Sequence, residues 1–236
     1  MKYGICLSGG GIKGIAHIGA LKAFEECNIQ FDCLSGTSSG SIVATLYASG
    51  YTCSEMLNIF NKYFKKIKYV DLKNIFNITR KLFKEHKLII EGLNSGETIE
   101  NIVKSCCASK GIYNIKDIKK DLVIASVSLN SGDVYIFESE EAKKRYSDNT
   151  KHIGNVEIGK AVRASCSFPG IFCPVNFNND LLIDGGVREN IPWKELMNKE
   201  IDELFCITFE EYKKIKKEKN IIDVISGAID LMIHLL

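Results

Sequence analysis

Short apolar runs alternate with helical patterns along this chain. Residues 3–7 form an apolar run that ends in a cluster of glycines, and residues 12–27 then place apolar side chains at helical spacing. A second apolar run at 31–35 leads through another glycine turn into a helical pattern over residues 41–48. The sequence therefore predicts the unit of strand, tight turn and helix twice within its first fifty residues.

The rest of the chain continues this alternation. Further helices are predicted over 54–107, with breaks at Gly92 and Gly96, over 157–165, and over the amphipathic tail 221–236. Further strands are predicted at 121–128 and 134–137, which flank a hairpin turn, at 181–183 and at 203–209. This alternation predicts an α/β fold with a largely parallel sheet that is covered on both faces. Its reactive loops are expected at the carboxyl ends of the strands.

Composition and charge are typical of a globular domain rather than of a nucleic-acid binder. The 236 residues are 45% hydrophobic and 25% charged, and 31 basic against 29 acidic residues give a net charge of +2. A charge so close to zero argues against a dedicated nucleic-acid partner. We expect a single domain over residues 1–236, with no nucleic acid among its partners.

The cysteines and the chain ends indicate the compartment. Nine cysteines occur without any Cys-x-x-Cys spacing, so we expect reduced, buried thiols and no zinc site. The apolar stretch after Met1 is too short for a signal peptide, and the tail 221–236 falls short of the ~20 apolar residues that span a bilayer. These features predict a cytoplasmic protein without a transmembrane segment.

The first glycine turn runs from Gly9 to Gly14 and fits the spacing Gly-x-Gly-x-x-Gly. A dinucleotide-binding module is one reading, and Asp32 lies at about the right distance for a ribose contact, but at the start of the second strand instead of its carboxyl end. A tight turn that binds nothing is another reading. The third is a set of bare backbone N–H groups at a helix N-terminus, which suits an anion or a developing oxyanion.

The second glycine turn, Gly36-x-Ser38-x-Gly40, fits a nucleophile elbow. In such a turn a strand and a helix pass closely around a strained serine, whose Oγ projects at the mouth of the sheet. A serine that only caps the following helix is the alternative. The order strand, turn, helix favours Ser38 as a nucleophile.

A serine nucleophile needs a base, and none of the four histidines occupies a favourable place. His17 lies in a predicted helix, His152 in a polar loop, and His86 and His234 near charged or terminal residues. Asp184 instead ends the strand at 181–183 and precedes two glycines, so it could accept the serine proton directly. A plain Asp-Gly turn is the alternative.

The three turns together, in this order, resemble the patatin-like phospholipases. The resemblance extends to His17-Ile18-Gly19 and, ahead of Asp184, to Arg163-Ala164-Ser165 and Phe168-Pro169-Gly170-Ile171-Phe172, and it covers residues 3 to about 209. It implies a three-layer α/β/α fold with a mainly parallel central sheet. It also implies that the chain hydrolyses fatty-acyl esters of lipids with a Ser-Asp dyad, without a metal or another cofactor.

The same resemblance assigns roles to residues of the three turns. Ser38 is the expected nucleophile and Asp184 the base. The residues expected to form the oxyanion hole are Gly9, Gly10 and Gly11. The residues expected to support the motifs are Lys13, Gly14, Gly36, Gly40, Gly185 and Gly186. Lys13 stands where arginine is common in the family, which keeps the charge but loses the planar fork.

A basic segment suggests how the chain reaches a lipid. Residues 61–90 carry nine basic and two acidic side chains, a charge of +7, interleaved with aromatic and aliphatic residues. This mixture suits an anionic membrane surface. We expect a helical, cap-like insertion around 54–107 and peripheral membrane contact. A solvated helical face is the alternative for the segment, and a lipid-binding protein without turnover is the alternative for the whole chain.

Overall fold

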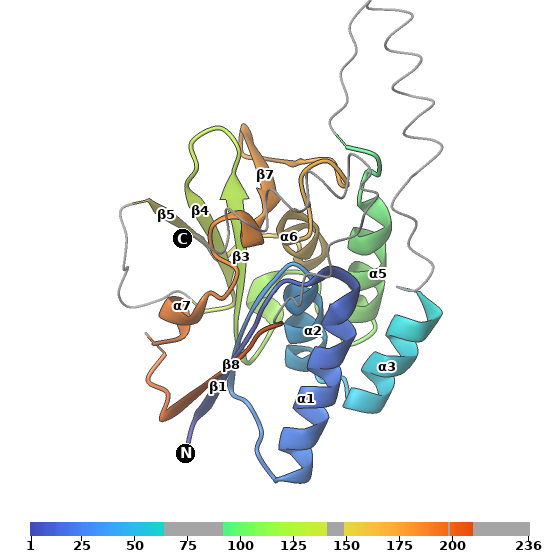
Figure 1. Cartoon of the computed structure of the whole chain (residues 1–236), viewed down its shortest axis with the longest axis vertical. Helices are drawn as coiled ribbons and strands as arrows, with labels where there is room; N and C mark the ends of the chain where they lie inside the picture. The colour runs from blue at the N-terminus through green and yellow to red at the C-terminus, as the bar shows by residue number, and fades with distance from the viewer. Residues whose placement is uncertain (64–91, 141–148, 198, 210–236) are drawn as a thin grey trace, which may run out of the picture.

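The computed structural model describes residues 1–63, 92–140, 149–197 and 199–209. A twisted sheet forms its centre, with most of the helices on one face and α7 on the other (Figure 1). The strands are β1 (Tyr3–Leu7), β2 (Cys33–Thr37), β3 (Asp121–Ser128), β4 (Val134–Glu138), β5 (Thr150–Ile153), β6 (Val175–Phe177), β7 (Asp180–Asp184) and β8 (Glu203–Ile207). The α-helices are α1 (Ile15–Glu26), α2 (Ser39–Ala48), α3 (Cys53–Lys62), α5 (Glu97–Ala108), α6 (Ile158–Ser165) and α7 (Trp193–Met197).

The middle of the sheet is parallel, as the sequence predicts. The strand order is β5-β4-β3-β2-β1-β8, and β8, β1, β2 and β3 all run in the same direction. Leu7 at the end of β1 pairs with Gly36 near the end of β2. The two glycine turns therefore leave the sheet at the same edge, which brings the first turn beside the second.

The far part of the sheet contains antiparallel pairs, and this changes how the third turn reaches the site. β4 returns along β3 as the expected hairpin. Thr37, the last residue of β2, pairs with Ala125, but β3 continues for three residues to Ser128. β7 pairs with this extension in the opposite direction, so that Asp184 lies opposite Ser126. The Asp184 turn thus arrives from beyond the end of β2, instead of leaving a parallel strand as expected.

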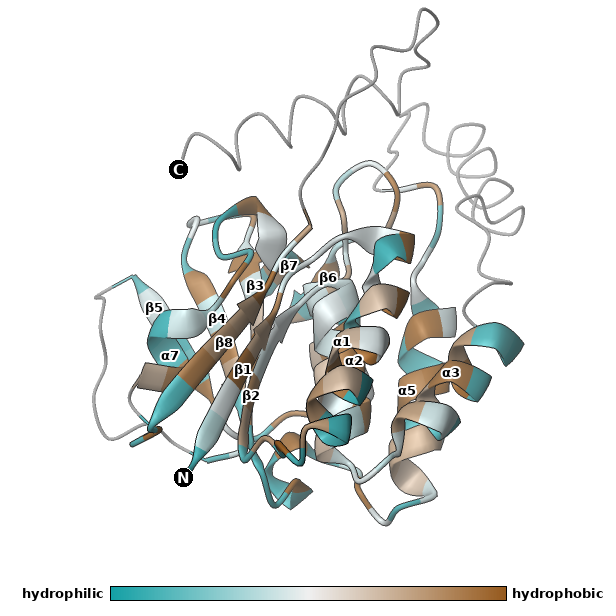
Figure 2. Ribbon diagram, turned by 60° about the horizontal axis from the view of Figure 1, so that its bottom comes forward, coloured by the Kyte–Doolittle hydropathy of each residue, from teal (hydrophilic) through white to brown (hydrophobic). Residues whose placement is uncertain are grey.

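The larger apolar core lies between the sheet and the helices α1, α2, α3, α5 and α6. Every residue of α2 is buried, because this helix lies between the sheet and its helical neighbours. Figure 2 shows α1, α3 and α5 in this layer with both hydrophilic and hydrophobic residues along each ribbon. Burial of apolar surface on this face is the main stabilising contribution to the fold.

The smaller core lies on the opposite face, under α7. Leu196 of α7 is fully buried there against strand residues such as Val123 and Ile136. The sheet is thus mixed, mainly parallel at its centre and flanked by helices on both faces, which confirms the expected fold class. None of the helices in the described part of the chain is long and apolar enough to cross a membrane.

The expected insertion around 54–107 is only partly visible. Its two ends are α3 and α5, whose apolar residues join the main core. Residues 64–91, which include most of the basic segment 61–90, lie outside the described residues, as does the expected tail helix 221–236. A cap beside the site therefore stays a prediction. The cysteines depart from expectation at two places, since Cys27 and Cys206 are exposed.

Candidate active site

Ser38 occupies a strained turn between β2 and α2. Its backbone has φ +52° and ψ −124°, a conformation that a non-glycine residue adopts only at a cost of about 1–3 kcal/mol. Its side chain is partly exposed, whereas the residues on either side of it, Thr37 and Ser39, are buried. This is the geometry of a nucleophile elbow, which holds one hydroxyl out of the sheet edge.

The glycines around Ser38 are required by close backbone contacts. A Cβ added at Gly40 would lie 2.1 Å from the carbonyl oxygen of Leu7, and one at Gly36 would lie 2.6 Å from the backbone of Gly40. Neither position can hold a side chain unless α2 moves away from the sheet. The two glycines thus let α2 begin directly beneath Ser38, with its positive end toward the Oγ.

Two hydroxyl groups hold the Ser38 backbone in this conformation. The Ser38 N–H donates to the Oγ of Ser165 at the end of α6, over 2.9 Å. The Ser41 hydroxyl donates to the Ser38 carbonyl oxygen over 2.6 Å. Both contacts satisfy buried polar groups. The Ser38 hydroxyl takes part in neither of these contacts.

Asp184 is buried at the end of β7, with 2% of its surface exposed. Its Oδ1 accepts the N–H of Gly186 over 2.8 Å. Burial raises the pKa of Asp184 to about 6, and hydrogen bonding from Ser38 and from Gly186 offsets part of that increase. Within the described residues, Oδ2 has no donor in full hydrogen-bonding geometry, so the Ser38 contact is a loose one. A loose contact between nucleophile and base is common before substrate binds.

The two glycines after Asp184 allow its turn to pack closely against the sheet. A Cβ added at Gly185 would lie 2.4 Å from the carbonyl oxygen of Ala125 and 3.1 Å from the Thr37 side chain. Gly186 supplies the N–H that binds Asp184. The third turn therefore packs against the end of β2, and its carboxylate comes next to Ser38.

The first glycine turn lies against Ser38, but its three N–H groups are not equivalent. A Cβ added at Gly9 would lie 3.2 Å from the Cβ of Ser38. The Gly9 N–H already donates to Oδ1 of Asn190 over 2.9 Å. Within the described chain, no acceptor binds the N–H of Gly10 or Gly11, and both residues are exposed. Gly11 has φ +56°, which favours glycine. The expected oxyanion donors thus reduce to Gly10 and Gly11.

The supporting residues of this turn have different surroundings. Gly14 is buried, and a Cβ there would lie 2.4 Å from the Ser39 side chain, so this glycine allows the first turn to contact the elbow. Lys13 is exposed beside the turn. Ile12, next to it, is 73% exposed at the same edge of the sheet.

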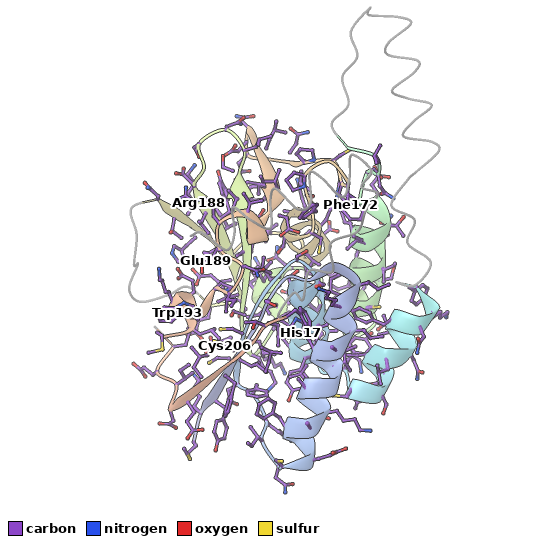
Figure 3. All side chains as sticks on the ribbon, viewed as in Figure 1. His17, Phe172, Arg188, Glu189, Trp193 and Cys206 are labelled. Carbon is purple, nitrogen blue, oxygen red and sulfur yellow. The ribbon has the colours of Figure 1, made fainter. Side chains whose placement is uncertain are left out.

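Neither described histidine contacts Ser38 or Asp184. His17 is fully buried, its Nε2 lies 2.9 Å from the carbonyl oxygen of Ser8, and burial lowers its pKa. His152 lies in β5 instead of a polar loop, with its Nδ1 2.9 Å from Glu138. Figure 3 shows His17 on α1 and Glu189 on the segment after β7. His86 and His234 lie outside the described residues.

Sequence reasoning assigned no role to Ser165, Cys166 and Asn190. Ser165 binds the Ser38 N–H, and Asn190 binds the Gly9 N–H. The buried Cys166 thiol interacts with Ser38 and with Asp184; burial, and after it the charge of Asp184, raises its pKa. For Ser165 a signal was present, because it belongs to one of the segments that carry the family resemblance. Asn190 follows Asp184 by six residues and lies outside those segments.

The surroundings of the first turn do not fit a dinucleotide. Asp32 lies one residue before β2, at the end of the strand away from the glycine turns. The carboxyl end of β2, where a ribose partner would be needed, holds Thr37 and Ser38. In the ranges that the structure describes, no three His, Cys, Asp or Glu side chains are grouped so that they could hold a metal ion.

Comparison with known proteins gives a family match and several relatives. The family model described as patatin-like phospholipase matches residues 5–197. The chain is 32% identical over 221 residues to the uncharacterized protein YqhO of Bacillus subtilis, which covers 91% of this chain and 73% of YqhO. It is 26% identical over 204 residues to lysophospholipase NTE1 of Candida albicans, which covers 86% of this chain and 13% of NTE1.

One solved structure matches most of this chain at low sequence identity. The structure of VipD from Legionella pneumophila gives a TM-score of 0.49 at 14% identity, and the match covers 89% of this chain and 51% of VipD. The chain therefore spans about half of VipD and a small part of NTE1.

Proposed function

The chain belongs to the patatin-like phospholipase family, and on that premise we propose that it is a serine hydrolase that cleaves fatty-acyl esters of lipids. The substrate class is a phospholipid or a lysophospholipid. One observation carries the proposal: the strained, partly exposed Ser38 lies beside the buried Asp184, whose pKa is raised to about 6. A carboxylate with this pKa is mostly ionised near neutral pH, yet basic enough to take a proton from serine.

The proposed reaction has two acyl-transfer steps. Ser38 Oγ attacks the ester carbonyl carbon while Asp184 accepts the hydroxyl proton. The N–H groups of Gly10 and Gly11 stabilise the oxyanion that forms. The bond to the alcohol then breaks, and Asp184 gives its proton to the alcohol oxygen as it leaves. Water attacks the acyl-Ser38 ester in the same way, which releases the fatty acid and restores the hydroxyl.

Lipid substrates imply contact with a membrane surface. We propose that this contact is peripheral and involves the basic segment 61–90, most of which lies outside the described residues. Reversing Lys65, Lys66 and Lys68 to glutamate is expected to weaken hydrolysis of anionic vesicles in low salt and to spare a short, soluble ester. Equal loss on both substrates would point to damage of the fold or of the site.

The direct test uses Ser38→Ala with a matched control. Ser38→Ala is expected to abolish ester hydrolysis and covalent labelling by a fluorophosphonate, because only the side chain of Ser38 is held out at the elbow. Ser105→Ala removes an exposed hydroxyl on α5 and is expected to change neither. Labelling that persists at another serine in Ser38→Ala would refute the assignment. Lipid binding by the wild-type chain without any hydrolysis would favour a lipid-binding protein instead.

A further inference from the structure

Asn190 joins the first glycine turn to the Asp184 turn. Its Oδ1 accepts the N–H of Gly9 over 2.9 Å, although the two residues are 181 positions apart in the sequence. The same oxygen lies 2.8 Å from the place of a Cβ at Gly9 and 3.4 Å from the place of a Cβ at Gly186. The amide oxygen therefore occupies the space between the two turns, where neither glycine has a side chain.

The residue before it joins the same region to the nucleophile turn. The Glu189 carbonyl oxygen accepts the hydroxyl of Thr37, next to Ser38, over 2.8 Å. The Glu189 N–H donates to the carbonyl oxygen of Gly185 over 2.7 Å. The consecutive residues Glu189 and Asn190 thus contact all three turns of the site. The relative positions of these turns depend on this short segment.

The position of the first glycine turn relative to Ser38 is important for catalysis, because this turn carries the proposed oxyanion donors. Donors that stabilise an oxyanion must lie about 2.7–3.1 Å from the place where the charge develops, and an error of about 1 Å can reduce the rate by about 10²-fold. Gly9 lies directly against Ser38, since a Cβ at Gly9 would be 3.2 Å from that of Ser38. Any shift of Gly9 would therefore move Gly10 and Gly11 relative to the nucleophile.

We propose that Asn190 is a positioning residue, which holds the glycine turn through the Gly9 N–H and so directs the N–H groups of Gly10 and Gly11 toward the developing oxyanion. The consequence for catalysis rests on the proposed hydrolase function. The hydrogen bond itself does not, so the two can be tested separately.

The first measurement follows the amide hydrogens of Gly9, Gly10 and Gly11 by NMR in the full chain. In the wild type, Gly9 is expected to exchange about tenfold more slowly than the other two, because one hydrogen bond protects it. Asn190→Leu removes the acceptor at similar size and is expected to abolish this protection. Asn190→Asp keeps an acceptor oxygen and is expected to retain it. The control is Asn101→Leu, a change at an exposed position on α5.

The second measurement separates transition-state from ground-state interactions. Asn190→Leu is expected to lower kcat about 10–100-fold and to change KM less than about threefold, since the donors act on the oxyanion and not on the bound ester. Affinity for a trifluoromethyl ketone, which forms a tetrahedral oxyanion on serine, is expected to fall by a similar factor. Affinity for the matched methyl ketone is expected to stay within about threefold.

The outcomes separate the two proposals. The positioning role is overturned by the wild-type measurement alone if the Gly9 amide hydrogen exchanges as fast as those of Gly10 and Gly11. The role is also refuted if Asn190→Leu frees Gly9 but leaves kcat unchanged, or if it weakens both ketones equally. Protected Gly9 in a wild-type chain that hydrolyses no ester and takes no fluorophosphonate would refute the hydrolase while supporting the Asn190 contact.

Discussion

The two faces of the sheet both hold buried carboxylates, but they surround them differently. On the α7 face, Asp121 lies 3.2 Å from the Lys2 ammonium and 3.8 Å from that of Lys199. On the face covered by most of the helices, the Asp184 carboxylate has no cation among its contacts in the described chain; it accepts the Gly186 N–H and lies in loose contact with Ser38 and near the Cys166 thiol. A buried carboxylate is stabilised where it is paired with a cation and is left reactive where it is not.

The pKa values of the two carboxyl groups reflect this difference. Burial by itself would raise the pKa of both carboxyl groups. At Asp121, hydrogen bonds from Cys33 and Lys2, together with the charge of Lys199, outweigh burial and lower the pKa below its usual value. At Asp184 burial prevails, and the pKa is raised to about 6. One carboxylate thus serves the fold, whereas the other is suited to accept a proton.

The largest effect is expected from Asp184→Asn. The amide keeps the size of the side chain but cannot accept the Ser38 proton, so kcat/KM should fall by at least about 10³-fold. The thermal midpoint should be equal to or higher than that of the wild type, because a buried ionisable group without a cation is removed. Hydrolysis of a soluble ester and a melting curve measure both quantities. Retained activity in Asp184→Asn, together with loss in His17→Ala or His152→Ala, would favour a triad.

The pH dependence of stability gives a second contrast. Because the folded-state pKa of Asp184 is raised from 3.8 to about 6, its stabilising contribution is present below pH 3.8 and is lost as the pH rises through 6. Asp184→Asn lacks this dependence. The free energy of unfolding of the variant should therefore exceed that of the wild type increasingly between pH 4 and 6, by at most about 3 kcal/mol, and then level off.

The same group should determine the acid limb of activity. With Asp184 as the base, kcat/KM should rise with pH up to a midpoint near 6, which is the pKa of this carboxyl in the free enzyme. Chemical denaturation at several pH values and a pH profile of soluble-ester hydrolysis provide the two curves. A stability gap that is flat between pH 4 and 6 would show that Asp184 does not have a raised pKa.

A third prediction concerns the paired carboxylate. Asp121→Asn leaves the buried Lys199 without one of its partners, so the free energy of unfolding should fall by about 2 kcal/mol. The loss should be largest near neutral pH and should diminish as the pH falls through the lowered pKa of Asp121, since its contribution is absent when the carboxyl is protonated. The kcat/KM of the folded protein should stay within about twofold of the wild type. A large loss of activity without loss of stability would contradict this contrast, because it would mean that Asp121 serves catalysis and not the fold.

Much of the helix-covered face could be predicted from the sequence, because its signals are local. The glycines at 36 and 40 mark a turn that the chain needs within a few residues, and β1, α1 and α2 follow from short-range periodicity. The apolar run at 31–35 predicts a strand that begins two residues before β2, since Phe31 is apolar but precedes the strand. The three turns were therefore found, with Ser38 and Asp184 as the proposed pair.

The features that were not predicted all depend on contacts between distant residues. The direction of β7 follows from its pairing with the far end of β3, which no periodicity reveals. The contact between Gly9 and Asn190 joins residues that are 181 positions apart in the sequence. The short strand that holds His152 has a polar sequence, and its buried His152 side chain pairs with Glu138 across to β4. A single sequence contains little information about such pairings.

The smallest of these effects is expected from Ser165→Ala. This change removes the acceptor of the Ser38 N–H and leaves a buried donor unsatisfied, so the elbow should become less well fixed. We expect kcat/KM to fall about tenfold. Ser128→Ala also removes a buried hydroxyl, which binds Asp180 at the far end of β3, and should leave kcat/KM unchanged. Equal losses in both variants would indicate a general effect of removing a buried hydroxyl.

The proposed pairing of Ser38 with Asp184 is tested most directly by trapping the acyl-enzyme. A chromogenic ester is mixed with the protein, the reaction is stopped with acid within the first turnover, and the acylated peptide is identified by mass spectrometry. One acyl group per chain, on the peptide that contains Ser38 in the wild type and absent in Asp184→Asn, is the expected result. An acyl group on another residue, or equal acylation of Ser38 in Asp184→Asn, would contradict it.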